Sequence, residues 1–297
     1  MSVPARILAF VAGLALVFGV GLSIGRAAGP DVTPVSGHGE DGASGHGEDA
    51  GHDEGGHGDD HAEASREDGH GGVVLELDRP RVTAGAGRSL AFHLLDEDGA
   101  AITSYDLKHE RDLHLIVVGV PALRDYQHLH PRLGDDGRWV TRADLAPGRY
   151  RVYADGSTGG EEFVAEATLR VRGERTGSRR VPPARTVDRV GPYAVSLDPG
   201  HDDTVTLRVS KDGRPVTDLQ PYLGASGHLV VIRRGSLDYL HAHPEDGPPG
   251  PEVSFGVEFD RPGVHRLFFD FQHDGVVRTA AFTLRVRGGA GGGEHEH

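Results

Sequence analysis

The sequence repeats a set of histidines whose spacing suits metal binding. In each copy a lone histidine starts an apolar run, and a His-x-His pair followed by proline comes further along the chain. These histidines are His114, His128 and His130 in the first copy and His228, His241 and His243 in the second. Both copies go on to a Pro-Gly pair, an aspartate seven residues after that glycine, and a final Leu-Arg-Val-Arg. The duplicated set predicts either two metal sites or one shared site.

The expected secondary structure brings these histidines together. Alternate residues of a β-strand point to the same face, so the two histidines of each pair share a face. If the lone-histidine strand pairs with the His-x-His strand, all three rings can meet at the end of a sheet, where the proline stops the strand. A fourth ligand is expected from a different loop in each copy, His109 in the first and His273 in the second.

The available ligand types restrict the metal. The chain has no cysteine and a single methionine, so imidazole, carboxylate and backbone oxygen remain as ligands. Three or four imidazoles fit Cu(II) or Zn(II) and do not suit Mg²⁺ or Ca²⁺. In the competing interpretation, the histidines are half-buried polar groups bonded to the backbone. Two roles are open for the neighbouring polar residues. Tyr126 and Tyr239 either donate hydrogen bonds to the site or only pack, and Asp155 and Asp270 either orient a ligand imidazole or end a strand.

Two all-β domains are expected to carry these residues. Each repeat shows about seven short segments of alternating apolar residues, separated by glycine, proline and aspartate. This pattern is typical of an antiparallel β-sandwich of the immunoglobulin or cupredoxin type. The predicted domains span residues 73–172 and 190–287, joined by a basic, proline-containing linker at 173–189. A Gly/His tail follows at 288–297.

The N-terminal part is predicted to anchor the domains outside the cytoplasm. Residues 1–28 contain an uncharged apolar run from Ile7 to Ile24 between two arginines. This length favours a single membrane-spanning helix over a cleaved signal peptide, and both place the rest of the chain on the extracytoplasmic side. Residues 29–72 are rich in Gly, His, Asp and Glu and are expected to be disordered and to bind metal weakly.

The charge distribution argues against nucleic acid as a partner. The formal net charge is -14. Residues 31–72 contain twelve Asp and Glu against one Arg, which gives -11 of that total. The remainder is mildly acidic and has no basic stripe.

The segments Leu113–Val118, His128–Pro131 and Pro147–Asp155 resemble those of uncharacterised bacterial envelope proteins, including YtkA-like β-domains, that are associated with copper or heavy-metal handling. The resemblance covers about residues 105–155 and, more weakly, 228–282. It implies metal ligation by the lone histidine and the His-x-His pair of each copy. The position equivalent to His109 is Leu223, which departs from the pattern.

These observations predict a membrane-anchored extracytoplasmic protein that binds a copper or zinc ion for capture, buffering or delivery to a transporter or sensor. The alternative is a structural or adaptor protein that presents tandem β-sandwiches to other proteins. An enzyme is not expected, because the sequence has no nucleophile elbow, phosphate loop or HExxH motif.

Overall fold

The computed structural model describes residues 72–174, 177–200, 204–240, 242–245, 247 and 250–287. All regular structure in this part of the chain is β-strand, which confirms the all-β prediction. The predicted anchor, the histidine-rich segment before Gly72 and the tail at 288–297 lie outside the described residues. No helix among the described residues is long and apolar enough to cross a membrane.

The first domain is a sandwich of two sheets. One sheet has the order β1-β3-β7-β6, and the other has the order β2-β9-β8-β4-β5. All pairs are antiparallel except β2 with β9, which are parallel. The strands are β1 (Val74–Leu77), β2 (Arg81–Thr83), β3 (Gly85–Leu95), β4 (Leu113–Val120), β5 (Arg124–Leu129), β6 (Arg132–Leu133), β7 (Arg138–Leu145), β8 (Gly148–Thr158) and β9 (Glu161–Arg172).

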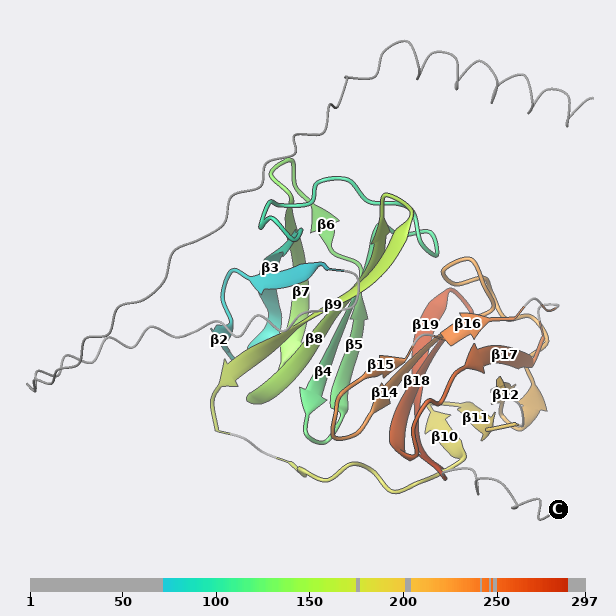
Figure 1. Ribbon diagram of the computed structural model, residues 1–297. Coiled ribbons are helices and arrows are strands. Elements are labelled where there is room, and N and C mark those ends of the chain that lie inside the picture. The colour runs from blue at the N-terminus through green and yellow to red at the C-terminus, as the bar shows by residue number, and fades with distance from the viewer. Residues whose placement is uncertain are drawn as a thin grey trace, which may run out of the picture. The chain divides into compact units, whose positions relative to one another are not determined.

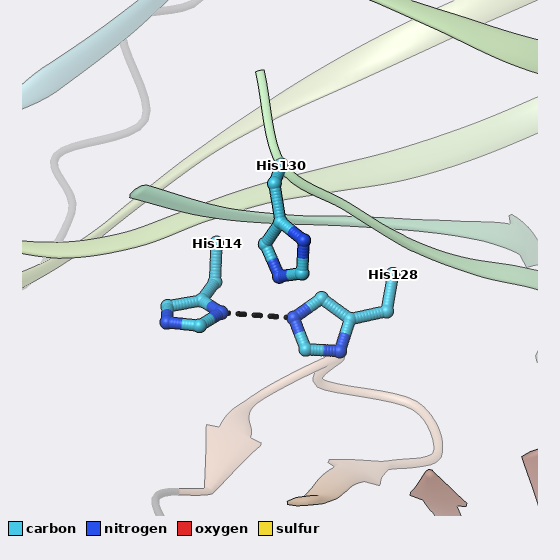
Figure 2. Close-up of side chains that lie close together, drawn as sticks. All are labelled: His114, His128 and His130. Atoms are coloured by element: carbon cyan, nitrogen blue, oxygen red, sulfur yellow. Dashed lines mark hydrogen bonds between the residues drawn. The ribbon is translucent and has the colours of Figure 1, made fainter. Parts of the chain in front are cut away.

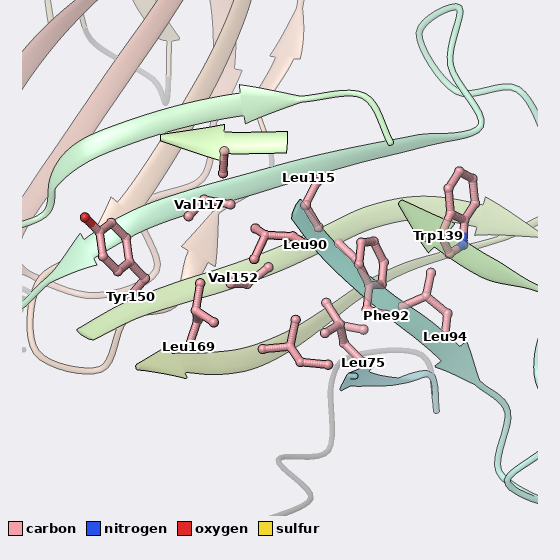
Figure 3. Close-up of a cluster of buried hydrophobic side chains, with 14 of the residues drawn as sticks. Leu75, Leu90, Phe92, Leu94, Leu115, Val117, Trp139, Tyr150, Val152 and Leu169 are labelled. Carbon is pink, nitrogen blue, oxygen red and sulfur yellow. The ribbon is translucent and has the colours of Figure 1, made fainter. Parts of the chain in front are cut away.

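The core of the first domain lies between these sheets (Figure 3). Strand β7 shows how the sequence builds it, because Trp139, Ala143 and Leu145 are buried while most residues between them are exposed or half-buried. This alternation is expected of a strand with one face against a core. Phe92 of β3 stacks on Trp139 with the ring centroids 6.5 Å apart.

The second domain repeats this arrangement. One sheet has the order β10-β11-β12-β17-β16, with β13 also paired to β12, and the other has the order β15-β14-β18-β19. A second apolar core fills the space between them. The strands are β10 (Val187–Val190), β11 (Tyr193–Asp198), β12 (Thr204–Lys211), β13 (Arg214–Pro215), β14 (His228–Arg233), β15 (Tyr239–Leu240), β16 (Ala242–Pro244), β17 (Glu252–Val257), β18 (Gly263–His273) and β19 (Val276–Val286).

The two His-x-His segments differ in their strands. In the first domain the segment lies on β5 and just beyond it, and β5 pairs with β4, which is the condition under which the three rings were expected to meet. The single strand predicted for residues 239–243 is wrong, because β15 pairs with β14 for two residues and β16 then pairs with β17 of the other sheet. The chain therefore changes sheet within the second His-x-His segment.

A third apolar core joins the two domains. It contains Ile116, Val118 and Tyr153 of the first domain and Val230, Ile232 and Phe268 of the second. Figure 1 shows the strands that carry them, β4, β8, β14 and β18, running through the middle of the two-domain unit. Each of β4 and β14 is covered on both faces, which explains why the residues after the lone histidine, 115–120 in β4 and 229–232 in β14, are all apolar.

Aromatic rings of one domain pack against rings of the other. Tyr126 stacks on Phe268 with centroids 4.1 Å apart, and Tyr239 lies against Tyr153 with centroids 5.4 Å apart. The repeat relates the two pairs, since Tyr126 corresponds to Tyr239 and Tyr153 to Phe268. The domains therefore meet through equivalent surfaces in a pseudo-twofold arrangement.

Candidate metal centre at the domain interface

Five imidazole rings gather at one end of the interface between the domains. The ring of His128 lies 5.2 Å from His114, 4.9 Å from His130 and 4.6 Å from His228, measured between centroids. The ring of His109 lies 6.0 Å from His114 and 6.1 Å from His228. The described rings thus form one cluster to which both domains contribute, and we call it the histidine cluster.

Strand pairing explains why the cluster forms. His114 is the second residue of β4 and shares a face with Ile116 and Val118, which belong to the interface core. On the neighbouring β5, His128 is the residue opposite Ile116. His228 starts β14 and lies opposite Asp270 of β18. The same side-chain alternation that buries the apolar interface residues therefore directs these rings to the interface.

Hydrogen bonds outside the cluster determine which nitrogens carry protons. The backbone carbonyl of Lys108 lies 3.0 Å from His114 Nε2, and a carbonyl oxygen only accepts, so Nε2 is the protonated atom. His128 Nδ1 lies 2.9 Å from Asp270 Oδ2. Tyr126 Oη and Thr279 Oγ1 also donate to the carboxylate of Asp270. This carboxylate is therefore an acceptor, and His128 carries its proton on Nδ1.

The two remaining nitrogens point at each other. His114 Nδ1 and His128 Nε2 are 3.0 Å apart, and in neutral rings protonated as above both atoms carry lone pairs. Figure 2 shows these two rings with His130 turned toward them. His130 Nε2 is itself buried and has no hydrogen-bond partner. The ligand atoms of these three histidines lie within 4.8 Å of one another, which suits a cation between them, either a shared proton or a metal ion.

Burial disfavours the shared proton. It is the largest cause that lowers the pKa of His114, and it lowers the pKa of both His128 and His130 to about 3. Burial also holds the pKa of His228 well below its usual range. The rings are therefore neutral near pH 7, and neutral imidazole is the form that binds metal.

The described residues offer two donor sets for an ion. One set is His114, His128 and His130, and the other is His128, His228 and Asp270. Within each set the ligand atoms lie within 4.8 Å of one another. The sets share His128, which stands between the domain-one histidines and the domain-two residues.

The tyrosines and aspartates singled out from the sequence connect the domains. Tyr126 Oη donates to Asp270 of the second domain over 3.1 Å, and Tyr239 Oη donates to Asp155 of the first over 3.0 Å. Asp270 also accepts from His128, so it orients an imidazole of the other domain. Asp155 instead forms a buried ion pair with Lys108 over 2.9 Å. Burial raises the pKa of Asp270, whereas the hydroxyl of Thr279 lowers it.

The turn that precedes each lone histidine breaks the pseudo-symmetry. His109 and Glu110 both have positive φ, and so do Leu223 and Gly224 at the equivalent positions. The backbone turn is thus repeated while its side chains differ. In the first domain it brings His109 to the cluster, whereas Leu223 is a buried apolar residue in the second. This confirms at the level of structure the departure that the sequence shows at Leu223.

His273 does not join the cluster, contrary to the prediction. Its Nδ1 lies 2.8 Å from Tyr193 Oη, and its Nε2 lies 3.2 Å from Asp218 Oδ1. The reason is strand alternation, because His273 is an odd number of residues from Asp270 and so points to the other face of β18. That face carries Phe271 of the domain-two core.

The second His-x-His pair is only partly described. His241 lies outside the described residues. The backbone of His243 lies on β16, where it pairs with Gly256 in the sheet that does not contain His228. Its side chain is not among those described. The two residues therefore stay predicted ligands.

Sequence reasoning missed two features of this site. The first is the carbonyl of Lys108, which fixes the tautomer of His114 and leaves no trace in a side-chain pattern. The second is that Asp270 accepts a hydrogen bond from His128 of the other domain. The signal for the second feature is the uninterrupted apolar run after each lone histidine, because it indicates a strand buried on both faces.

Comparisons of the whole chain with solved structures give immunoglobulin-like and fibronectin-like β-domains. The biofilm-associated protein BSP domain is 12% identical with a TM-score of 0.22, and the match covers 72% of this chain and 30% of that chain. A two-domain fibronectin type III segment of chicken tenascin is 10% identical with a TM-score of 0.22, covering 71% of this chain and 97% of that chain. The Escherichia coli adhesin FdeC is 14% identical with a TM-score of 0.22, covering 73% and 64%.

At these TM-scores the likeness carries no argument about function. The chain spans less than a third of the biofilm-associated protein. The sequence matches no curated protein. None of the matches named here is a YtkA-like or copper-handling protein, so that part of the resemblance stays a prediction. A family model matches residues 67–173 and again 188–288, and the chain therefore belongs to the family described as Domain of unknown function (DUF8832), of which it carries two copies.

Proposed function

We propose that this protein binds a divalent transition-metal ion, copper or zinc, in the histidine cluster. The observation that carries the proposal is the pair of facing nitrogens, His114 Nδ1 and His128 Nε2, 3.0 Å apart with no proton left for either in the neutral rings. The unpartnered Nε2 of His130 supplies a third donor. The proposed ion lies between these three nitrogens and is bound by their lone pairs.

The dimensions support this assignment. Two imidazole nitrogens bound to one tetrahedral Zn²⁺ at about 2.0 Å are about 3.3 Å apart. The observed 3.0 Å is close to that separation, so a small movement of either ring suffices. Imidazole ligands without sulfur or additional carboxylates favour Zn(II) or Cu(II) over Mg²⁺ and Ca²⁺.

The surroundings of two of the three rings also resemble those of metal-bound histidines. A metal-ligating histidine usually donates its other N–H to a carboxylate or a backbone carbonyl, which orients the ring. Asp270 has this role for His128, and the Lys108 carbonyl has it for His114. Asp270 comes from the second domain, so metal binding depends on the docked pair of domains.

The proposed cellular role is inferred from the N-terminal part of the sequence. Metal capture, buffering or delivery on the extracytoplasmic side of the membrane, with a transporter or sensor as the partner, rests on the apolar segment 7–24 and the histidine-rich segment 29–72. The latter would concentrate ions loosely, while the histidine cluster would hold one tightly.

Metal retention by the full-length chain, produced without an affinity tag, tests the proposal. The chain is washed with a chelator, reloaded with Zn²⁺ or Cu²⁺, dialysed and assayed for bound metal. The His114→Ala/His128→Ala double variant is expected to retain less metal than the unaltered chain. The His93→Ala variant is the control, because His93 lies on β3 near Asp78 and away from the interface. Equal retention by all three proteins would refute the proposal.

A structural role is the second candidate function. It is favoured by the apolar interface core and the reciprocal Tyr–Asp bonds, which hold two β-domains in a fixed arrangement suited to presenting a surface. In that case the histidines act as internal hydrogen-bonding groups. The retention assay separates the two functions, since a purely structural cluster retains no metal although its loss lowers the melting temperature.

A further inference from the structure

The second donor set of the histidine cluster lies across the domain interface. It consists of His128 from the first domain and of His228 and Asp270 from the second. Its ligand atoms lie within 4.8 Å of one another. Asp270 Oδ2 is 2.9 Å from His128 Nδ1, and the ring of His228 is 4.6 Å from that of His128.

A buried nitrogen without a partner points to a ligand at this second set. His228 Nδ1 is buried and accepts or donates no hydrogen bond. A buried polar atom left without a hydrogen-bond partner is unfavourable. In the equivalent ring, His114 Nε2 donates to the carbonyl of Lys108 and Nδ1 faces His128 Nε2.

We infer that the cluster is a two-ion centre in which the ring of His128 connects the ions. One ion takes Nε2 of His128 with His114 and His130, and the other takes Nδ1 of His128 with His228 and Asp270. This inference rests on the proposed function and extends it from one ion to two.

The second ion replaces a proton. When it binds, the bond between His128 Nδ1 and its hydrogen breaks, the proton leaves to solvent, and Nδ1 uses the freed electron pair to bind the ion. Asp270 at the same time changes from hydrogen-bond acceptor to ligand. The first ion assists, since a cation bound to one nitrogen of the ring weakens the hold of the other nitrogen on its proton.

The negative groups of the centre favour binding of the second ion after the first. Before the second ion binds, the first position has only neutral imidazole ligands and lies near the carboxylate of Asp270. In the two-ion state, Asp270 and the His128 imidazolate that both ions share offset two of the four positive charges. The two ions are therefore expected to bind in sequence, the first at the domain-one histidines and the second across the interface.

Counting ions in single-ligand variants tests the inference. The untagged full-length chain is loaded with Zn²⁺ and dialysed, and the number of ions per chain is compared with that of His128→Ala and His228→Ala. Ions bound to the histidine-rich segment do not affect the comparison, because that segment is the same in all the proteins and contributes equally to each count. His228→Ala is expected to lose one ion, and His128→Ala is expected to lose two because it belongs to both sets. His265→Ala is the control and is expected to lose no ion. His265 is a buried histidine of the second domain on the core-facing side of β18.

Loading with Cu²⁺ gives a second measurement that does not depend on counting. Two Cu²⁺ ions joined by one ring couple magnetically, so the paramagnetic resonance intensity of the unaltered chain falls below that of two isolated ions. His228→Ala is expected to restore the signal of a single isolated ion. If His128→Ala loses one ion and His228→Ala loses none, the two-ion centre is wrong while the proposed metal function stands. If neither variant loses an ion, the proposed function fails as well.

Discussion

Replacing Asp270 by asparagine is expected to weaken metal binding although none of the domain-one ligands is substituted. Asp270 accepts hydrogen bonds from His128 Nδ1 at 2.9 Å, from Tyr126 Oη at 3.1 Å and from Thr279 Oγ1. Asparagine has nearly the same shape but only one acceptor oxygen, and its amide nitrogen donates. With its oxygen taken by Thr279, the amide nitrogen faces His128 Nδ1, and two donors then oppose each other.

The ring of His128 relieves this conflict by changing tautomer. Its proton moves to Nε2, the nitrogen that faces His114 and is to bind the ion. Loss of a carboxylate that orients a ligating histidine typically reduces metal affinity by about 10- to 100-fold. This reduction corresponds to about 1.4–2.8 kcal/mol of binding free energy.

Competition with a chromophoric chelator at pH 7.5 measures the change in affinity for the tightest Zn²⁺ ion. Asp188→Asn is the matched control, because Asp188 is also a buried carboxylate but is bonded to Arg185 and to the backbone of Ala281. Its affinity is expected to equal that of the unaltered chain. An affinity of Asp270→Asn within a factor of two of the unaltered chain, with the fold intact, would refute the tautomer argument.

Three further predictions concern stability. Phe268→Ala, which removes a ring from the interface core, is expected to lower the free energy of unfolding by about 3–5 kcal/mol in urea denaturation; a change under about 1 kcal/mol would show that the interface contributes little. The metal-free chain is expected to lose stability as the pH falls from 6.5 toward 3, because His128 has a pKa of about 3 when folded and 6.5 when unfolded, so the unfolded chain binds more protons in this range; a melting temperature that is flat between pH 7 and 5 would contradict this. Gly227→Ala is expected to destabilise by about 1–3 kcal/mol and to displace His228, since its Cβ would lie 2.5 Å from the ring of Phe269; thermal denaturation and metal retention measure the two effects, and a variant as stable as the unaltered chain would contradict the close approach.

The sequence alone determined the all-β class and the shared face of alternate histidines, whereas the pairing of β4 with β5, on which the meeting of the rings depends, is shown by the structure. Both follow from local periodicity, since alternate residues share a face and glycine and proline separate the strands. The meeting of His114, His128 and His130 is therefore predictable from sequence spacing together with the pairing of neighbouring strands.

Three features were decided only by the tertiary structure. His228 and Asp270 reach His128 because the two repeats dock face to face through their apolar strands, and such docking depends on surfaces far apart in the sequence. His273, three residues after that aspartate, lies away from the site because residues an odd number of positions apart on a strand point to opposite faces. The tautomer of His114 depends on a backbone carbonyl, and a backbone group is the same in every residue, so only its position in space gives it a role.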